Sequence, residues 1–120
     1  MKNRHLLIVD DDVDYLLLLA DFLEDKGWEI TTATNGKHAC ELFYSNPDKY
    51  SVILTDYNMP IMTGLEFIHK LRSDGYQIPI VLISGELELL NIDEIVNSDT
   101  KALHKPVQFS ELERIIASFD

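Results

Sequence analysis

Short apolar runs alternate with helical patterns along this chain, and this alternation limits how it can fold more than any other feature. The runs have the composition of buried β-strands and occur at Leu6 to Val9, Glu29 to Thr34, Val52 to Leu54, Ile80 to Ile83 and around Leu103. Such strict alternation with short connections favours a parallel sheet with right-handed crossovers and helices on both faces. We therefore predict an α/β fold, a three-layer sandwich of five strands and five helices.

The predicted helices are recognised by apolar residues at helical spacing. Their stripes are Val13, Leu16, Leu17, Ala20 and Leu23; Ala39, Leu42 and Phe43; Leu65, Ile68 and Leu71; Leu89, Ile92, Ile95 and Val96; and Leu112, Ile115, Ile116 and Phe119. Gly27 is expected to end the first helix. Two pairs, Thr63 with Glu66 and Ser110 with Glu113, have the spacing of a capping box and predict where the third and fifth helices begin.

The length, net charge, apolar stretches and cysteine content of the chain exclude several classes of protein. A chain of 120 residues has room for one core, so we expect residues 1–120 to form a single domain. The net charge of -11 would repel nucleic acid and anionic membranes, and we expect neither as a partner. The apolar stretches are far shorter than the roughly 20 residues of a membrane span, and the first is too short for a signal peptide, which predicts a cytoplasmic protein. Cys40 is the only cysteine, which excludes an internal disulfide.

Polar side chains gather at the carboxyl ends of the predicted strands, where open α/β sheets bind ligands. They are Asp10, Asp11 and Asp12 after the first strand, Asp56 after the third, Ser84 and Gly85 after the fourth, and Lys105 after the fifth. If the first and third strands are neighbours, at least three carboxylates converge and repel one another unless they are protonated or bound to a metal. Oxygen ligands without His or Cys suit Mg2+, and a hydroxyl with an ammonium group would bind phosphoryl oxygens. The pattern predicts a phosphoryl-transfer site.

Each of these features alone also has a purely structural explanation. The Asp run could cap the following helix, with Asp12 as the capping residue. Asp56 could begin a turn, and Lys105 could be an ordinary turn residue before a trans proline. The functional interpretation depends on their coincidence at one edge of one sheet.

These motifs resemble those of the receiver domains of two-component response regulators. The match runs from Arg4 to Phe119. Its motifs are Ile8-Val9-Asp10-Asp11-Asp12, Leu54-Thr55-Asp56-Tyr57-Asn58-Met59-Pro60 with Gly64, Val81-Leu82-Ile83-Ser84-Gly85, and Lys105-Pro106. The resemblance implies a flavodoxin-like receiver fold with strand order 2-1-3-4-5 and a cis Lys105-Pro106 peptide.

The resemblance also implies a role for each site residue. Asp56 would be the phosphoacceptor, assisted by Lys105 and Ser84. The Mg2+ ligands would be Asp10 through water, Asp11, Asp56 and the main-chain carbonyl of Asn58. The side chains of Asn58 and Glu86 would line the approach of water and set the lifetime of the phosphoryl group.

As a receiver, the chain would take its phosphoryl group from a sensor histidine kinase or a histidine phosphotransfer protein. It would then switch conformation, catalysing only its own phosphorylation and dephosphorylation. A homodimer or a target protein could bind through the fourth helix, fifth strand and fifth helix. One position departs from the family. Ala102 stands three residues before the lysine, where the family usually has Tyr or Phe, so the usual fifth-strand rotamer switch cannot operate in its usual form.

Other functions fit the sequence less well. A receiver-like interaction module that is not phosphorylated would be expected to have lost Asp56 or Lys105. A Mg2+-dependent phosphatase of the haloacid-dehalogenase type needs Thr or Val four residues after its nucleophile, and Asp14 stands four residues after Asp10. A flavin carrier would need a phosphate loop where this chain has three Asp residues.

The first helix leaves one question open. Leu18, Leu19 and Phe22 lie off its apolar stripe. They form either a docking face for a kinase helical bundle or a second buried surface.

Overall fold

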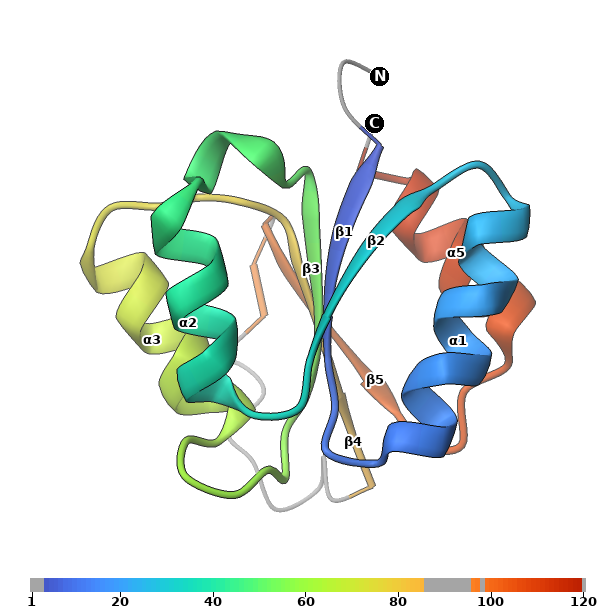
Figure 1. Ribbon diagram of the computed structural model, residues 1–120, viewed down its shortest axis with the longest axis horizontal. Coiled ribbons are helices and arrows are strands. Elements are labelled where there is room, and N and C mark those ends of the chain that lie inside the picture. Colours follow the sequence, from blue (N-terminus) through green and yellow to red (C-terminus); the bar gives the residue numbers. More distant parts are fainter. Residues whose placement is uncertain (1–3, 86–95, 98, 120) are drawn as a thin grey trace.

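The computed structural model describes residues 4–85, 96–97 and 99–119. Five parallel strands form one sheet in the order β2-β1-β3-β4-β5, which confirms the predicted fold and strand order (Figure 1). The strands are β1 His5–Val9, β2 Glu29–Ala33, β3 Val52–Asp56, β4 Ile80–Ser84 and β5 Thr100–His104. The helices are α1 Val13–Asp25, α2 Gly36–Ser45, α3 Gly64–Ser73 and α5 Phe109–Ala117, with a short 3-10 helix η1 Pro47–Lys49. The fourth predicted helix falls almost wholly on residues 86–95, outside the described part of the chain.

The sheet separates two apolar cores. Helices α2 and α3 cover one face, where Phe43 and Phe67 are fully buried. Helices α1 and α5 cover the other, where Leu23, Trp28 and Ile116 are buried. The three central strands are buried along their whole length, while the edge strands β2 and β5 are more exposed, as expected of a parallel sheet covered by helices. No helix in the described ranges combines the length and hydrophobicity needed to cross a bilayer.

The buried face of α1 differs from the predicted stripe. Leu17, predicted to face the core, is 59% exposed, whereas Leu19, predicted to lie off the stripe, is 1% exposed. The helix packs through Leu16, Leu19, Ala20 and Leu23. This set and the predicted one both have helical spacing, and four consecutive leucines let either set form an apolar face. The open question is therefore answered in part: Leu19 is buried, Phe22 is half-buried, and Leu18 is 64% exposed.

One predicted capping box is confirmed and the other is wrong. The Thr63 main-chain N–H donates to Glu66 Oε1 at 2.9 Å, and the Glu66 N–H donates to Thr63 Oγ1 at 3.2 Å. Helix α5 instead begins at Phe109, with Gln108 as its N-cap residue and no side-chain capping bond. Ser110 therefore lies inside the helix. The Phe109 ring packs against aromatic side chains of α1, and this tertiary contact accounts for the earlier start.

The loop between β3 and α3 returns close to the end of β3. Gly64, the first residue of α3, donates its N–H to the Tyr57 carbonyl at 2.8 Å. A Cβ atom at Gly64 would lie 2.3 Å from the main-chain oxygen of Asp56 and 3.0 Å from Tyr57 Cα. Only glycine leaves room for this approach, so Gly64 fixes where the chain turns beside Asp56.

We predict that Gly64→Ala destabilises the fold by about 1–3 kcal/mol, because the added methyl group meets backbone that cannot move aside. Thermal unfolding followed by circular dichroism should show a melting temperature several degrees lower. Gly85→Ala is the matched control, since a Cβ atom there meets nothing within 4 Å. Equal melting temperatures for the two variants would contradict the steric argument.

Candidate functional site

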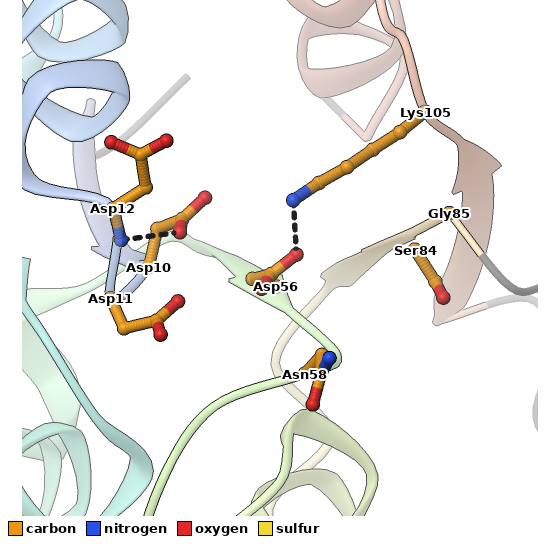
Figure 2. Close-up of a pocket in the computed structure, with 8 residues that line it drawn as sticks. All are labelled: Asp10, Asp11, Asp12, Asp56, Asn58, Ser84, Gly85 and Lys105. Carbon is orange, nitrogen blue, oxygen red and sulfur yellow. Dashed lines mark hydrogen bonds and ion pairs between the residues drawn. The ribbon is translucent and has the colours of Figure 1, made fainter.

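A hollow lies at the carboxyl edge of the sheet, where the sequence predicted it. Its lining consists of Asp10, Asp11, Asp12, Asp56, Asn58, Ser84, Gly85 and Lys105 (Figure 2). Parallel register explains the convergence, because β1 pairs with β3, β3 with β4 and β4 with β5 so that all their carboxyl ends meet at one edge. The predicted site residues within the described part of the chain are therefore brought together.

Three carboxylates lie close together in this hollow. Asp10, Asp11 and Asp56 each offer an oxygen, and these atoms all lie within 4.8 Å of one another. Asp10 and Asp56 are buried, while Asp11 is exposed. Asp10 is held in place because its Oδ1 accepts the Asp12 main-chain N–H at 3.0 Å (Figure 2).

Asp12 has the structural role that its position before α1 suggested. It is the N-cap residue of the helix, and its Oδ1 accepts the Tyr15 main-chain N–H at 3.2 Å. This bond satisfies a donor that has no partner inside the helix. Asp12 thus fixes the first turn of α1 beside the other carboxylates.

Lys105 supplies a positive charge to the cluster. Its Nζ lies 2.7 Å from Asp56 Oδ1, and its side chain is 38% exposed, against 6% for Asp56. The Lys105 main-chain N–H donates to the Ser84 carbonyl at 2.9 Å, which places the residue directly beyond β5. The Lys105-Pro106 peptide is cis, as the resemblance implied.

The pKa values of the cluster indicate that Lys105 compensates its negative charge only in part. Burial, together with the charges of Asp56 and Asp11, raises the pKa of Asp10 to about 6, although the Asp12 N–H and Lys105 oppose the shift. Burial also raises the pKa of Asp56 despite its bond to Lys105. Burial alone would lower the pKa of Lys105, but its bond to Asp56 raises it, so the ammonium stays charged.

The donor set fits a hard divalent cation. Each of the three clustered carboxylates offers an oxygen atom, and a divalent ion would offset the repulsion that a single ammonium leaves uncompensated. Ser84 is buried on the β4 side of the hollow, and Asn58 follows β3 two residues after Asp56. Their roles, and the use of the Asn58 carbonyl as a ligand, stay predictions. Glu86 lies outside the described residues.

The sequence did not single out Tyr15 as part of the site. Its ring lies beside Lys105, with the Lys105 Nζ 5.9 Å from the ring centroid. Burial and then the charge of Asp10 raise the pKa of its phenol, which reflects how near the ring stands to the acidic cluster. Its place in the first turn of a helix that begins at the strand end was the one available signal.

Comparison with known proteins shows which family the chain is similar to. The sequence model of the response regulator receiver domain matches residues 6–117. The rice (Oryza sativa subsp. japonica) two-component response regulator ORR5 is 34% identical over 114 residues, covering 92% of this chain and 84% of its own length. The autoinducer 1 sensor kinase/phosphatase LuxN of Vibrio harveyi is 31% identical over 98% of this chain, which spans 14% of LuxN.

The fold is similar to that of a solved response regulator. The response regulator TrrA of Thermotoga maritima, solved in complex with Mg(2+)-BeF, superposes with a TM-score of 0.85 at 26% identity, covering 98% of this chain and 99% of that one. A match over nearly the whole sequence and a shared fold lead to one conclusion. The chain belongs to the response regulator receiver domain family.

Proposed function

We propose that residues 1–120 act as one receiver domain that accepts a phosphoryl group on Asp56 in a Mg2+-dependent reaction. The observation that carries this proposal is the pairing of Asp56 with Lys105 at 2.7 Å, beside two further carboxylates whose oxygens lie within 4.8 Å. This arrangement combines a nucleophile, a fixed positive charge and a set of oxygen ligands for a metal. The donor is the phosphohistidine of a sensor histidine kinase or of a histidine phosphotransfer protein.

In this reaction an Asp56 carboxylate oxygen attacks phosphorus in line. The phosphorus–nitrogen bond breaks, its electron pair returns to the imidazole of the donor, and an acyl phosphate forms. Lys105 and Ser84 stabilise the oxygens of the transferred group. Mg2+ would be held by Asp10 through water, Asp11, Asp56 and the Asn58 carbonyl. When bound, it supplies further positive charge to those oxygens.

The same pairing argues against two of the alternative functions, the phosphatase and the interaction module. In a phosphatase of the haloacid-dehalogenase type, Asp10 would be the nucleophile, but Lys105 pairs with Asp56 instead. A module that only docks partners has no use for a buried carboxylate paired with a lysine, an arrangement that costs desolvation energy. The contact between Asp56 and Lys105 thus supports the phosphorylation that we propose.

The proposal includes a cytoplasmic signalling role. The net charge of -11 disfavours direct binding to nucleic acid or anionic membranes. Homodimer or target contacts through the fourth helix, β5 and α5 stay part of the proposal, and most of that helix falls outside the described residues. Ala102 lies in the middle of β5, so the signal must reach this surface without an aromatic side chain at that position.

The exposed face of α1 is the docking surface that we propose for the donor. Leu17 and Leu18 are 59% and 64% exposed, and they line a shallow hollow together with Asp14, Asp21 and Glu24. The face lies on the helix that Asp12 caps beside the carboxylate cluster. A partner helix with apolar residues flanked by basic ones would complement both its shape and its charge.

We predict that acetyl phosphate adds one phosphoryl group to the wild-type chain only when Mg2+ is present. Intact mass spectrometry measures the gain. Asp56→Asn should show none, because an amide is a poor nucleophile, and Lys105→Ala should react more slowly. A phosphoryl gain in Asp56→Asn would place the acceptor elsewhere, and no gain in the wild type would favour the docking-module alternative.

We predict that Asp10→Asn stabilises the metal-free protein at neutral pH. The raised pKa of Asp10 means that the folded state disfavours its charged form. The resulting cost is absent below pH 3.8, grows as pH rises towards 6 and is complete above it. An amide removes this cost, on the order of 2–3 kcal/mol, and its oxygen still accepts the Asp12 N–H.

Thermal unfolding between pH 3.5 and 8 measures the difference. The melting temperature of Asp10→Asn should exceed that of the wild type above pH 6, and the two should meet near pH 4. Added Mg2+ should raise the melting temperature of the wild type more than that of the variant. A variant that is less stable than the metal-free wild type at pH 7.5 would show that Asp10 contributes favourable contacts that outweigh the repulsion.

We predict that Leu18→Gln weakens phosphotransfer from a protein donor and leaves the reaction with acetyl phosphate unchanged. Removing a leucine from an interface costs about 1.5–3 kcal/mol, which corresponds to a fall of about tenfold or more in transfer at limiting donor. The donor is a histidine phosphotransfer protein first shown to phosphorylate the wild-type chain. Equal transfer to both proteins would remove α1 from the docking surface.

A further inference from the structure

Tyr15 stands between the site and the last helix. It lies in the first turn of α1, and its main-chain N–H is fixed by the Asp12 cap at 3.2 Å. Its ring is partly buried in the core that α1 and α5 share. The helix cap on the main chain and the packing of the side chain therefore both hold this ring beside the carboxyl edge of the sheet.

The ring lies beside the one lysine that reaches the acidic cluster in the described structure. Lys105 Nζ is 5.9 Å from the centroid of the Tyr15 ring and 2.7 Å from Asp56 Oδ1. An ammonium at this distance from an aromatic face is attracted by the ring quadrupole. Lys105 thus has a contact on the side of α1 in addition to its carboxylate partner.

Packing from α5 supports the ring on another side. Phe109, the first residue of α5, meets the Tyr15 ring edge-on, with centroids 5.8 Å apart and planes at 70°. Phe22, two turns further along α1, packs against the same Phe109 ring, with the ring centroids 5.3 Å apart. A ring fixed in this way can limit where the long lysine side chain goes.

We propose that Tyr15 is a positioning residue, whose ring holds the Lys105 ammonium over the phosphoacceptor. This inference rests on the proposed function, since it assigns Tyr15 a role in the same phosphorylation. The lysine side chain has four rotatable bonds and is 38% exposed, so an unsupported ammonium would also populate positions in solvent. The attraction comes from the aromatic face, and therefore the phenol hydroxyl is not required.

The test compares four full-length proteins: the wild type, Tyr15→Phe, Tyr15→Leu and Phe22→Leu. Phe22→Leu is the matched control because it removes a ring from the same aromatic group without touching the contact to Lys105. Rates of phosphorylation by acetyl phosphate with Mg2+ are followed by intact mass. Tyr15→Leu should react about 2- to 5-fold more slowly, while Tyr15→Phe and Phe22→Leu should keep the wild-type rate.

Two further measurements separate positioning from a general loss of structure. In a Lys105→Ala background, Tyr15→Leu should have no additional effect, because the group that the ring positions is absent. In proteins labelled with 13C-lysine, the ε-methylene signal of Lys105, assigned by its loss in Lys105→Arg, should carry a ring-current displacement. That displacement should persist in Tyr15→Phe and disappear in Tyr15→Leu.

The outcomes distinguish this inference from the proposed function. If the wild type is phosphorylated and Tyr15→Leu reacts at the same rate, the positioning role is wrong and the receiver function stands. If Tyr15→Leu slows the reaction equally with and without Lys105, the effect is structural and the inference is again overturned. If the wild type takes up no phosphoryl group, the proposed function fails, and an unchanged Lys105 signal in Tyr15→Leu would separately overturn the contact.

Discussion

Repulsion among carboxylates at one edge of a parallel sheet is the constraint on which this structure depends. Parallel pairing of β1 with β3 places Asp10 and Asp56 side by side in a buried position, and Asp11 adds a third charge. Two local interactions offset part of this repulsion. The Asp12 main-chain N–H donates to Asp10, and the Lys105 ammonium pairs with Asp56. Part of the negative charge stays uncompensated, so the cluster favours a further cation. The stability of the fold therefore depends on the charge at this one site.

The sequence was sufficient to predict the sheet and the content of the site, for a physical reason. Strands buried on both faces give continuous apolar runs, and a parallel arrangement then brings every strand end to one edge, so the residues after each run must meet. Asp56 and Lys105 could be placed together on that basis, although they are far apart in the sequence. Their 2.7 Å contact, and the raised pKa values that follow from burial, required the coordinates.

Features that depend on packing between helices could not be predicted in the same way. Four consecutive leucines in α1 allow two apolar faces of nearly equal quality, and only the fit against the sheet and α5 selects Leu19 over Leu17. Helix α5 begins two residues earlier than a Ser110 cap predicts, because Phe109 packs against rings of α1. Tyr15 was missed for the same reason, since nothing local in the sequence shows that its ring lies beside Lys105.

The position of that ring bears on how a change at Asp56 could reach the surface. A phosphoryl group on Asp56 would draw the Lys105 ammonium toward new oxygens, so the other contacts that Lys105 makes would change. On β5, Ala102 has no large side chain to move in response. Instead, the Lys105 ammonium lies over the Tyr15 ring on α1, and that ring packs against Phe109 at the start of α5. Close packing makes such contacts respond in discrete steps. In the described structure, a continuous chain of contacts therefore leads from Asp56 through Lys105 and Tyr15 to Phe109 in the first turn of α5.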